Sequence, residues 1–208
     1  MEELNLTAAF RRLCPLAGHA ARRRGALPCP RLQGAFLFAL ALLLLPSPSA
    51  VQANSRHAGE YQVKAAFILN FTNFIDWPDS SLSSDAFIIG ILGRDPFGGA
   101  IDSLNGKTAK GRKVVIRRYD DPGEAREADI LFISDSEKRA LPRILKALRN
   151  RPVLTVGDSQ GFARSGVMIG MLLHGTRVGF EINNRAAHQA GIRISSRLLR
   201  LAGEVIEP

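Results

Sequence analysis

Apolar positions from about residue 60 onward predict alternating helices and strands. Residues 60–75 carry apolar side chains at three- and four-residue spacing, which predicts an amphipathic helix that ends before Pro78. Glu60 and Lys64 stand four residues apart on it, in the orientation that stabilises a helix. Short apolar runs between polar, glycine or proline residues predict buried strands, and segments with helical spacing or caps lie between them. The predicted strands are 86–92, 113–118, 129–133 and 152–156, and the predicted helices between them are 96–104 and 134–148.

The pattern changes after residue 157. Two strand-like runs, 167–173 and 177–182, flank His174-Gly175-Thr176, which predicts an antiparallel hairpin. Asn184 is expected to cap a short helix, and Ser195 a last amphipathic one after an extended segment at 192–194. The order predicts a single three-layer α/β domain, with a mostly parallel sheet, helices on both faces and an antiparallel hairpin at one edge.

Residues 1–53 have the pattern of a secretory signal peptide. Arginines at 22–24 and 31 precede an apolar run at 34–45, and a proline-containing break follows. Val51 and Ala53 supply the small residues that signal peptidase needs, so cleavage is predicted after Ala53, leaving one domain over 54–208. The apolar run is shorter than the roughly 20 residues that span a membrane. An uncleaved N-terminal anchor is the alternative.

Charge and cysteine content narrow the function classes. The chain has a net charge of +9, but 6 of its arginines lie in the leader, so residues 54–208 carry 22 basic and 17 acidic residues. Such a balance, without interleaved aromatic residues, does not favour a nucleic-acid partner. Cys14 and Cys29 both belong to the leader, which leaves the predicted mature domain without a disulfide, a thiol nucleophile or a cysteine-ligated metal.

Catalytic patterns are missing from the sequence. His57, His174 and His188 share no metal-ligand spacing, and no G-x-S-x-G nucleophile elbow occurs. We therefore expect no catalytic residues, no metal site and no cofactor, and we expect a protein that is not an enzyme.

Two loops are candidates for a binding rim. Arg94 and Asp95 follow the first predicted strand, and Asp158 and Ser159 follow the fourth. Because ligands bind at the carboxyl ends of parallel strands, these residues could share one small-ligand site. The structural alternative is that Asp95 caps a helix and that both loops are ordinary turns.

The first helix offers a second candidate surface. Phe67 and Phe71 lie on its apolar face. They belong either to the domain core, as on most amphipathic helices, or to a surface that the helix presents to a protein partner.

A series of short motifs, in this order, gives the chain a family resemblance. They are EYQVKAAF at 60–67, NFTNFIDWP at 70–78, GRDPFG at 93–98, ILFIS at 130–134, LTVGD at 154–158 with GFA at 161–163, FEIN at 180–183 and AGIRISSRLLRLA at 190–202. The series resembles the YfiR-like family of periplasmic α/β proteins and covers nearly the whole predicted mature chain.

The resemblance implies regulation in the periplasm. The family's namesake represses an inner-membrane diguanylate cyclase by binding its periplasmic sensor region, and an outer-membrane lipoprotein relieves the repression, so that cyclic di-GMP and biofilm formation respond. The expected partners are therefore such a cyclase or another sensor, an outer-membrane lipoprotein, and a second copy of the chain as a homodimer. Redox control through a family disulfide does not carry over, because residues 54–208 lack cysteine. A small-ligand binding module and an accessory protein for a non-cyclase sensor remain the alternatives.

Overall fold

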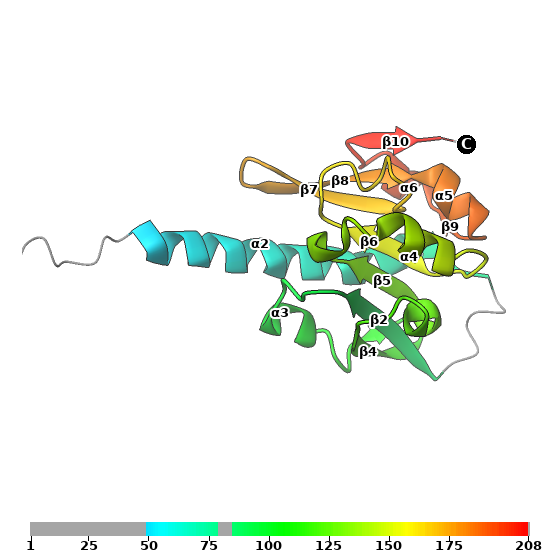
Figure 1. Ribbon diagram of the computed structural model, residues 1–208, viewed down its shortest axis with the longest axis horizontal. Helices are drawn as coiled ribbons and strands as arrows, with labels where there is room; N and C mark the ends of the chain where they lie inside the picture. Colours follow the sequence, from blue (N-terminus) through cyan, green and yellow to red (C-terminus); the bar gives the residue numbers. More distant parts are fainter. Residues whose placement is uncertain (1–48, 79–84, 208) are drawn as a thin grey trace, which may run out of the picture. The chain divides into compact units, whose positions relative to one another are not determined.

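An eight-stranded sheet forms the centre of the computed structural model, which describes the backbone of residues 49–78 and 85–207 and, within these ranges, side chains from Ala58 onward (Figure 1). Its strand order is β10-β8-β7-β6-β5-β2-β4-β3. The strands are β2 Ala86–Leu92, β3 Thr108–Ala109, β4 Arg112–Tyr119, β5 Ile130–Ile133, β6 Leu154–Gly157, β7 Ile169–His174, β8 Arg177–Asn183 and β10 Glu204–Ile206.

The sheet confirms the predicted α/β class. Strands β4, β2, β5, β6 and β7 are mutually parallel, while β7 and β8 form the expected antiparallel hairpin near one edge. Two short strands were not predicted: β3 pairs antiparallel with β4, and β10 pairs parallel with β8 outside the hairpin. Both have at most three residues, too few for a period-two pattern to stand out.

The first described helix ends earlier than its apolar spacing predicts. Helix α2 covers Ser49–Phe71, the 3₁₀ turn η1 covers Thr72–Phe74, and Ile75 lies in strand β1 (Ile75–Asp76). Strand β1 pairs with β9 (Arg193–Ile194), with Ile75 opposite Ile194. Ile75 is fully buried in this strand pair. It is therefore apolar because of the pairing, and it matches the helical spacing without being part of the helix.

Three predicted helix starts are wrong, each for a local reason. Helix α3 (Gly99–Asp102) begins after Gly98, whose φ of +53° is left-handed. Ser134 caps only the 3₁₀ turn η4 (Asp135–Glu137), and α4 (Leu141–Ala147) begins separately with Pro142 near its start. Helix α5 (Asn184–Gln189) is capped by Asn183, whose Oδ1 accepts from the Ala186 amide at 2.9 Å, and not by Asn184.

Apolar side chains on the two sheet faces form two separate cores, which makes the three layers. Ile89 and Ile91 face the larger core beneath α2, α3, α5 and α6 (Ser196–Leu199, capped by Ser195 as predicted). Ile88 and Leu92 face the smaller core beneath α4 and the 3₁₀ turn η3 (Glu124–Glu127). Alternate residues of one strand therefore serve opposite layers, as a strand covered on both faces requires.

The predicted leader lies mostly outside the described residues. The structure describes α2 from Ser49 onward, so the predicted cleavage after Ala53 falls within the backbone of that helix and stays a prediction. Across residues 49–78 and 85–207, no helix combines the length and the apolar character needed to cross a membrane.

Candidate functional site

The carboxyl edge of the sheet brings together three loops, at the ends of β2, β5 and β6. Tyr61 on α2 joins two of them: its ring contacts Phe97 edge-on at 5.2 Å between centroids, and its hydroxyl donates to Asp158 Oδ2 at 2.8 Å. Phe97 in turn packs on Phe132 of β5, with centroids 4.7 Å apart. The loops that carry Arg94 and Asp158 therefore share one rim, beneath α2.

A buried ionic cluster, formed by Glu60, Tyr61, Lys64 and Asp158 and called the Lys64 cluster below, occupies this rim. Lys64 is only 3% exposed, and its ammonium lies 2.7 Å from Asp158 Oδ2 and also forms an ion pair with Glu60. It lies 4.4 Å from the centroid of the Tyr61 ring. Burial, together with the Asp158 carboxylate, raises the pKa of Tyr61 above its ordinary value of 10.0. A buried cation that has carboxylate partners of its own chain is best explained as a structural clamp between α2 and β6.

Ser159 closes the same rim toward β5. Its hydroxyl donates to Asp135 Oδ1 at 2.6 Å, which joins the loop after β6 to the one after β5. Asp158 and Ser159, both predicted as candidate binding residues, are thus hydrogen-bonded to other residues of the domain.

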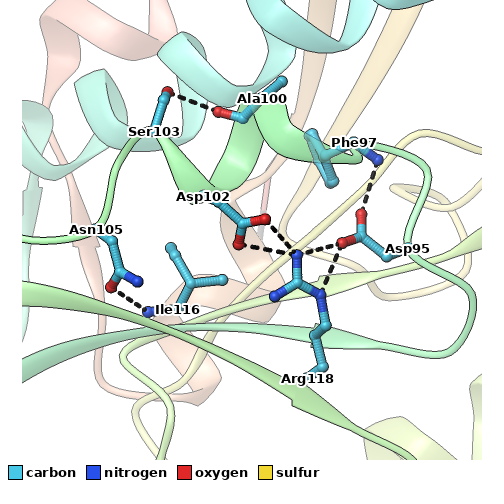
Figure 2. A network of polar contacts seen from close by, with 8 residues as sticks. All are labelled: Asp95, Phe97, Ala100, Asp102, Ser103, Asn105, Ile116 and Arg118. Atoms are coloured by element: carbon cyan, nitrogen blue, oxygen red, sulfur yellow. Dashed lines mark hydrogen bonds and ion pairs between the residues drawn. The ribbon is translucent and has the colours of Figure 1, made fainter.

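Asp95 belongs to a second network at the edge (Figure 2). Its Oδ1 accepts from the Phe97 amide at 2.7 Å, and its Oδ2 lies 2.9 Å from Arg118 Nε. The Arg118 guanidinium also binds both carboxylate oxygens of Asp102 on α3, and this hydrogen bond raises the pKa of Arg118. Asp95 therefore organises the turn that precedes α3 and ties it to β4. Contrary to the structural alternative, it does not cap a helix, because α3 begins after Gly98.

Arg94 is the exposed member of the predicted rim. Its side chain forms no hydrogen bond or ion pair within the part of the chain that the structure describes, while its backbone amide donates to Ser136 Oγ at 3.0 Å. The neighbouring Gly93 has a φ of +86°, and a Cβ there would lie 2.5 Å from Ser136 Oγ. Side chains of η4 therefore fill the crevice between the ends of β2 and β5, where parallel sheets commonly bind ligands.

The two phenylalanines of the first helix separate into a core residue and an edge residue. Phe71 is 1% exposed and packs edge-on against Phe180 of β8 at 5.4 Å between centroids. Phe67 is partly exposed and lies 5.9 Å from Phe71 and 6.0 Å from Phe180. Phe71 is therefore not available to a partner on this surface, whereas Phe67 is.

An apolar surface next to Phe67 was missed in the sequence. Leu173 and Val178 lie opposite each other in the hairpin, two residues beyond Met171 and Phe180 on the same sheet face. Met171 and Phe180 are buried, but Leu173 is 48% exposed. The period-two pattern of Met171, Leu173, Val178 and Phe180 is the signal that could have indicated this face.

Helix α2 extends this apolar surface. Val63 lies one turn before Phe67 and is 45% exposed. Helix α2 and the β7–β8 hairpin project from the sheet in the same direction (Figure 1). We call the surface formed by Val63, Phe67, Leu173 and Val178 the apolar edge.

Metal ligation finds no support within the described ranges. No three side chains among their His, Asp and Glu residues are grouped so that they could hold a metal ion.

Two solved structures share a distant likeness with this chain. One is an ABC domain in complex with L-Trp from Streptococcus pneumoniae, 12% identical, with a TM-score of 0.43 and coverage of 58% of this chain and 55% of that chain. The other is a conserved domain protein from Vibrio cholerae O1 biovar eltor, 13% identical, with a TM-score of 0.48 and coverage of 70% and 60%. The likeness spans less than two thirds of either solved protein.

The family model gives the identification. The model described as YfiR/HmsC-like matches residues 61–203, which is more than half of the chain and runs from the second half of α2 to the end of the loop after α6. The matched region contains the carboxyl-edge loops, the hairpin and every member of the Lys64 cluster except Glu60, which lies one residue before it. The match agrees with the ordered motifs of the sequence and supports a regulatory theme, and the chain belongs to the YfiR/HmsC-like family.

Proposed function

We propose that the protein is a periplasmic regulatory binding protein that represses a membrane signalling enzyme through the enzyme's periplasmic sensor region. The first candidate for this enzyme is a diguanylate cyclase. Membership of the YfiR/HmsC-like family over residues 61–203 is the observation that carries this proposal. The signal-peptide pattern of residues 1–53 supports the location.

The architecture of the carboxyl edge supports binding rather than catalysis. A general acid or base must be free to exchange a proton with a substrate. At this edge, Asp95 is bonded to Arg118, Asp158 to Lys64 and Tyr61, and Asp135 to Ser159. The carboxylates of the predicted rim and the Ser159 hydroxyl thus hold loops together, which is the role of a rigid scaffold for a surface elsewhere.

The apolar edge is the contact surface that we propose for the sensor region. Partner-binding surfaces contain exposed aliphatic and aromatic side chains next to a well-packed support. Leu173 and Val63 are two of the three large apolar side chains that are strongly exposed in the described ranges, and Phe180 supports the surface from below.

Repression requires a difference in affinity between two states. The protein must bind the inactive conformation of the sensor region more tightly than the active one, since a ligand with equal affinity for both would shift nothing. A ratio of about 10⁴ between the two affinities is needed to move a sensor from almost fully active to almost fully inactive.

Cyclic di-GMP in cells without this gene tests the function. We expect the level to rise, and to return when the exported protein is restored but not when a version without residues 1–53 is restored. An unchanged level would contradict repression of a cyclase and leave a non-cyclase sensor as the alternative. Binding of the purified exported protein to the periplasmic region of the cyclase, measured by calorimetry, separates direct from indirect repression.

A further inference from the structure

A basic cleft lies at the edge of the sheet opposite the Lys64 cluster. It is lined by the amino ends of β6 and β7, the end of β8, the last turn of α4 and helix α5. Its volume is about 430 Å³. Clefts that hold small ligands measure roughly 300–1,000 Å³, so this one has room for a small organic molecule.

The charges around the cleft have one sign. Five cationic side chains line it, and none of its lining residues, all of which lie in the described ranges, is Asp or Glu. They come from three separate segments: Lys146, Arg149 and Arg151 from the end of α4 and the loop after it, Arg164 from the loop before β7, and Arg185 from α5. Their convergence from separate segments is not explained by the dipole of one helix.

Two of these cations have internal partners and three do not. Arg164 forms an ion pair with Glu204 at 2.7 Å, and Arg185 donates to the Glu207 carbonyl oxygen at 2.9 Å. Lys146, Arg149 and Arg151 are without an ion pair or side-chain hydrogen bond to any described residue. Arg151 also lines a neighbouring hollow, together with Glu124 and Glu127. Lys146 and Arg149 are therefore the two cations of the cleft that have neither an internal partner nor a place in that hollow.

The floor of the cleft adds a hydrogen-bond donor and an apolar surface. Thr155 is 2% exposed, and its Oγ1 accepts from the Met168 amide at 3.0 Å. No acceptor among the described residues takes the hydrogen of this hydroxyl, which leaves it available to a ligand oxygen. Leu145, Val153 and Met168 also line the cleft.

We propose that this cleft binds a small molecule carrying a phosphate-type dianion, with the phosphate against Arg149 and Lys146 and the apolar body against Leu145 and Met168. Several cations around one cavity match a doubly charged anion better than a single carboxylate. The fork of an arginine guanidinium matches two phosphate oxygens at once. The proposal is independent of the protein partner, because the cleft and the apolar edge have no residue in common.

Calorimetry with inorganic pyrophosphate as the probe tests the site. The exported protein is titrated at constant ionic strength, with sodium chloride as the blank. We expect saturable binding that Arg149→Ala and Lys146→Ala each weaken by at least about tenfold, as loss of a charge-assisted hydrogen bond implies. Arg139→Ala and Arg200→Ala are matched controls: both side chains are exposed and lie outside the cleft.

The fold of each variant is checked independently. Trp77 is the one tryptophan of the chain and is buried, so its fluorescence follows unfolding in urea. Lys146 and Arg149 are exposed, and we expect unchanged unfolding midpoints. No saturable binding of pyrophosphate, or an equal loss in Arg139→Ala and Arg149→Ala, would overturn the proposal.

Vesicles distinguish the two sources of such a phosphate. Co-sedimentation with phosphatidic acid vesicles, whose phosphomonoester can carry two charges, would assign the cleft to a lipid headgroup if pyrophosphate reverses it and Arg149→Ala abolishes it. Pyrophosphate binding without co-sedimentation would assign it to a soluble phosphorylated molecule. Phosphatidylcholine vesicles control for attachment that does not depend on the anionic headgroup.

Discussion

Lys64 of α2 and Asp158 after β6 form an ion pair of 2.7 Å in which both side chains are almost fully buried, although they stand 94 residues apart in the chain. The pair fixes the helix that covers the larger core to the carboxyl edge of the sheet. Removing one partner of a buried pair is costly, because the other charge remains buried.

Replacing Lys64 with methionine should therefore lower the free energy of unfolding by about 3 kcal/mol. Methionine keeps much of the side-chain volume, but it leaves the carboxylates of Asp158 and Glu60 without their shared cation. Urea unfolding followed by the fluorescence of Trp77 measures the loss. The exposed Lys138, replaced in the same way, should change stability by less than about 0.5 kcal/mol.

A double variant shows whether the effect belongs to the pair. Asp158→Asn added to Lys64→Met should cost less than the sum of the two single changes, since the uncompensated carboxylate is then absent. Additive losses would contradict the buried ion pair as the cause.

This pair marks the boundary of what the sequence could predict. The spacing of Glu60 and Lys64 predicts an ion pair on one helix, and the structure confirms it. Spacing says nothing about a third partner 94 residues away, nor that the cation is buried. Likewise the motif of Arg94 and Asp95 predicts a loop after the first strand, but only the fold shows that Asp95 pairs with Arg118, which also binds Asp102.

In the secondary structure, too, local sequence patterns predict some features, whereas others depend on contacts between distant residues. Strand β2 has the predicted bounds, because a continuous apolar run of seven residues between polar neighbours has one satisfactory conformation in a two-sided sheet. The apolar spacing predicts that Ile75 is helical, but an apolar residue at this position fits the period of a strand equally well. Its pairing with Ile194, a tertiary contact, places it in a strand. Local patterns thus predicted the elements, while their ends depend on distant partners.

Titration of the two tyrosines should be displaced to high pH. Burial raises the pKa of Tyr119 to about 12 and, with Asp158, raises that of Tyr61 above its ordinary value. The folded protein therefore holds both phenolic protons more tightly than the unfolded chain. The contribution of these two groups to stability is fully present below about pH 10 and is lost as the pH rises through their folded pKa values.

Phenolate absorbance measures this directly. The folded protein should show little ionisation at about pH 11, whereas the chain in urea should titrate both tyrosines near pH 10. Tyr61→Phe should leave one transition, that of Tyr119. A tyrosine that ionises near pH 10 in the folded protein would contradict its burial.

Two glycines test the filled crevice at the ends of β2 and β5. Gly93 and Gly98 both have positive φ, so alanine at either should cost about 1–2 kcal/mol in backbone strain. A Cβ at Gly98 has no atom within 4 Å, but at Gly93 it meets Ser136 Oγ and the Glu137 side chain. Moving Ser136 away would break its hydrogen bond with the Arg94 amide. We expect Gly93→Ala to lower the free energy of unfolding by about 1 kcal/mol or more beyond Gly98→Ala; equal losses in urea would mean that the crevice has room.

Introducing a negative charge on the apolar edge separates effects on folding from effects on partner binding. Leu173 is 48% exposed and Leu201 is 65% exposed, so aspartate at either position should leave the urea midpoint nearly unchanged. Leu173 lies on the apolar edge, whereas Leu201 follows α6 and lies outside it. A carboxylate in an interface loses its hydration without gaining a partner, so Leu173→Asp should weaken binding to the sensor region at least tenfold, or by about 1.4 kcal/mol. Leu201→Asp should bind like the unchanged protein. Calorimetry with the purified sensor region gives both affinities. Equal affinities for the two variants would contradict the apolar edge as the interface. Repression itself would still be tested by the level of cyclic di-GMP in cells.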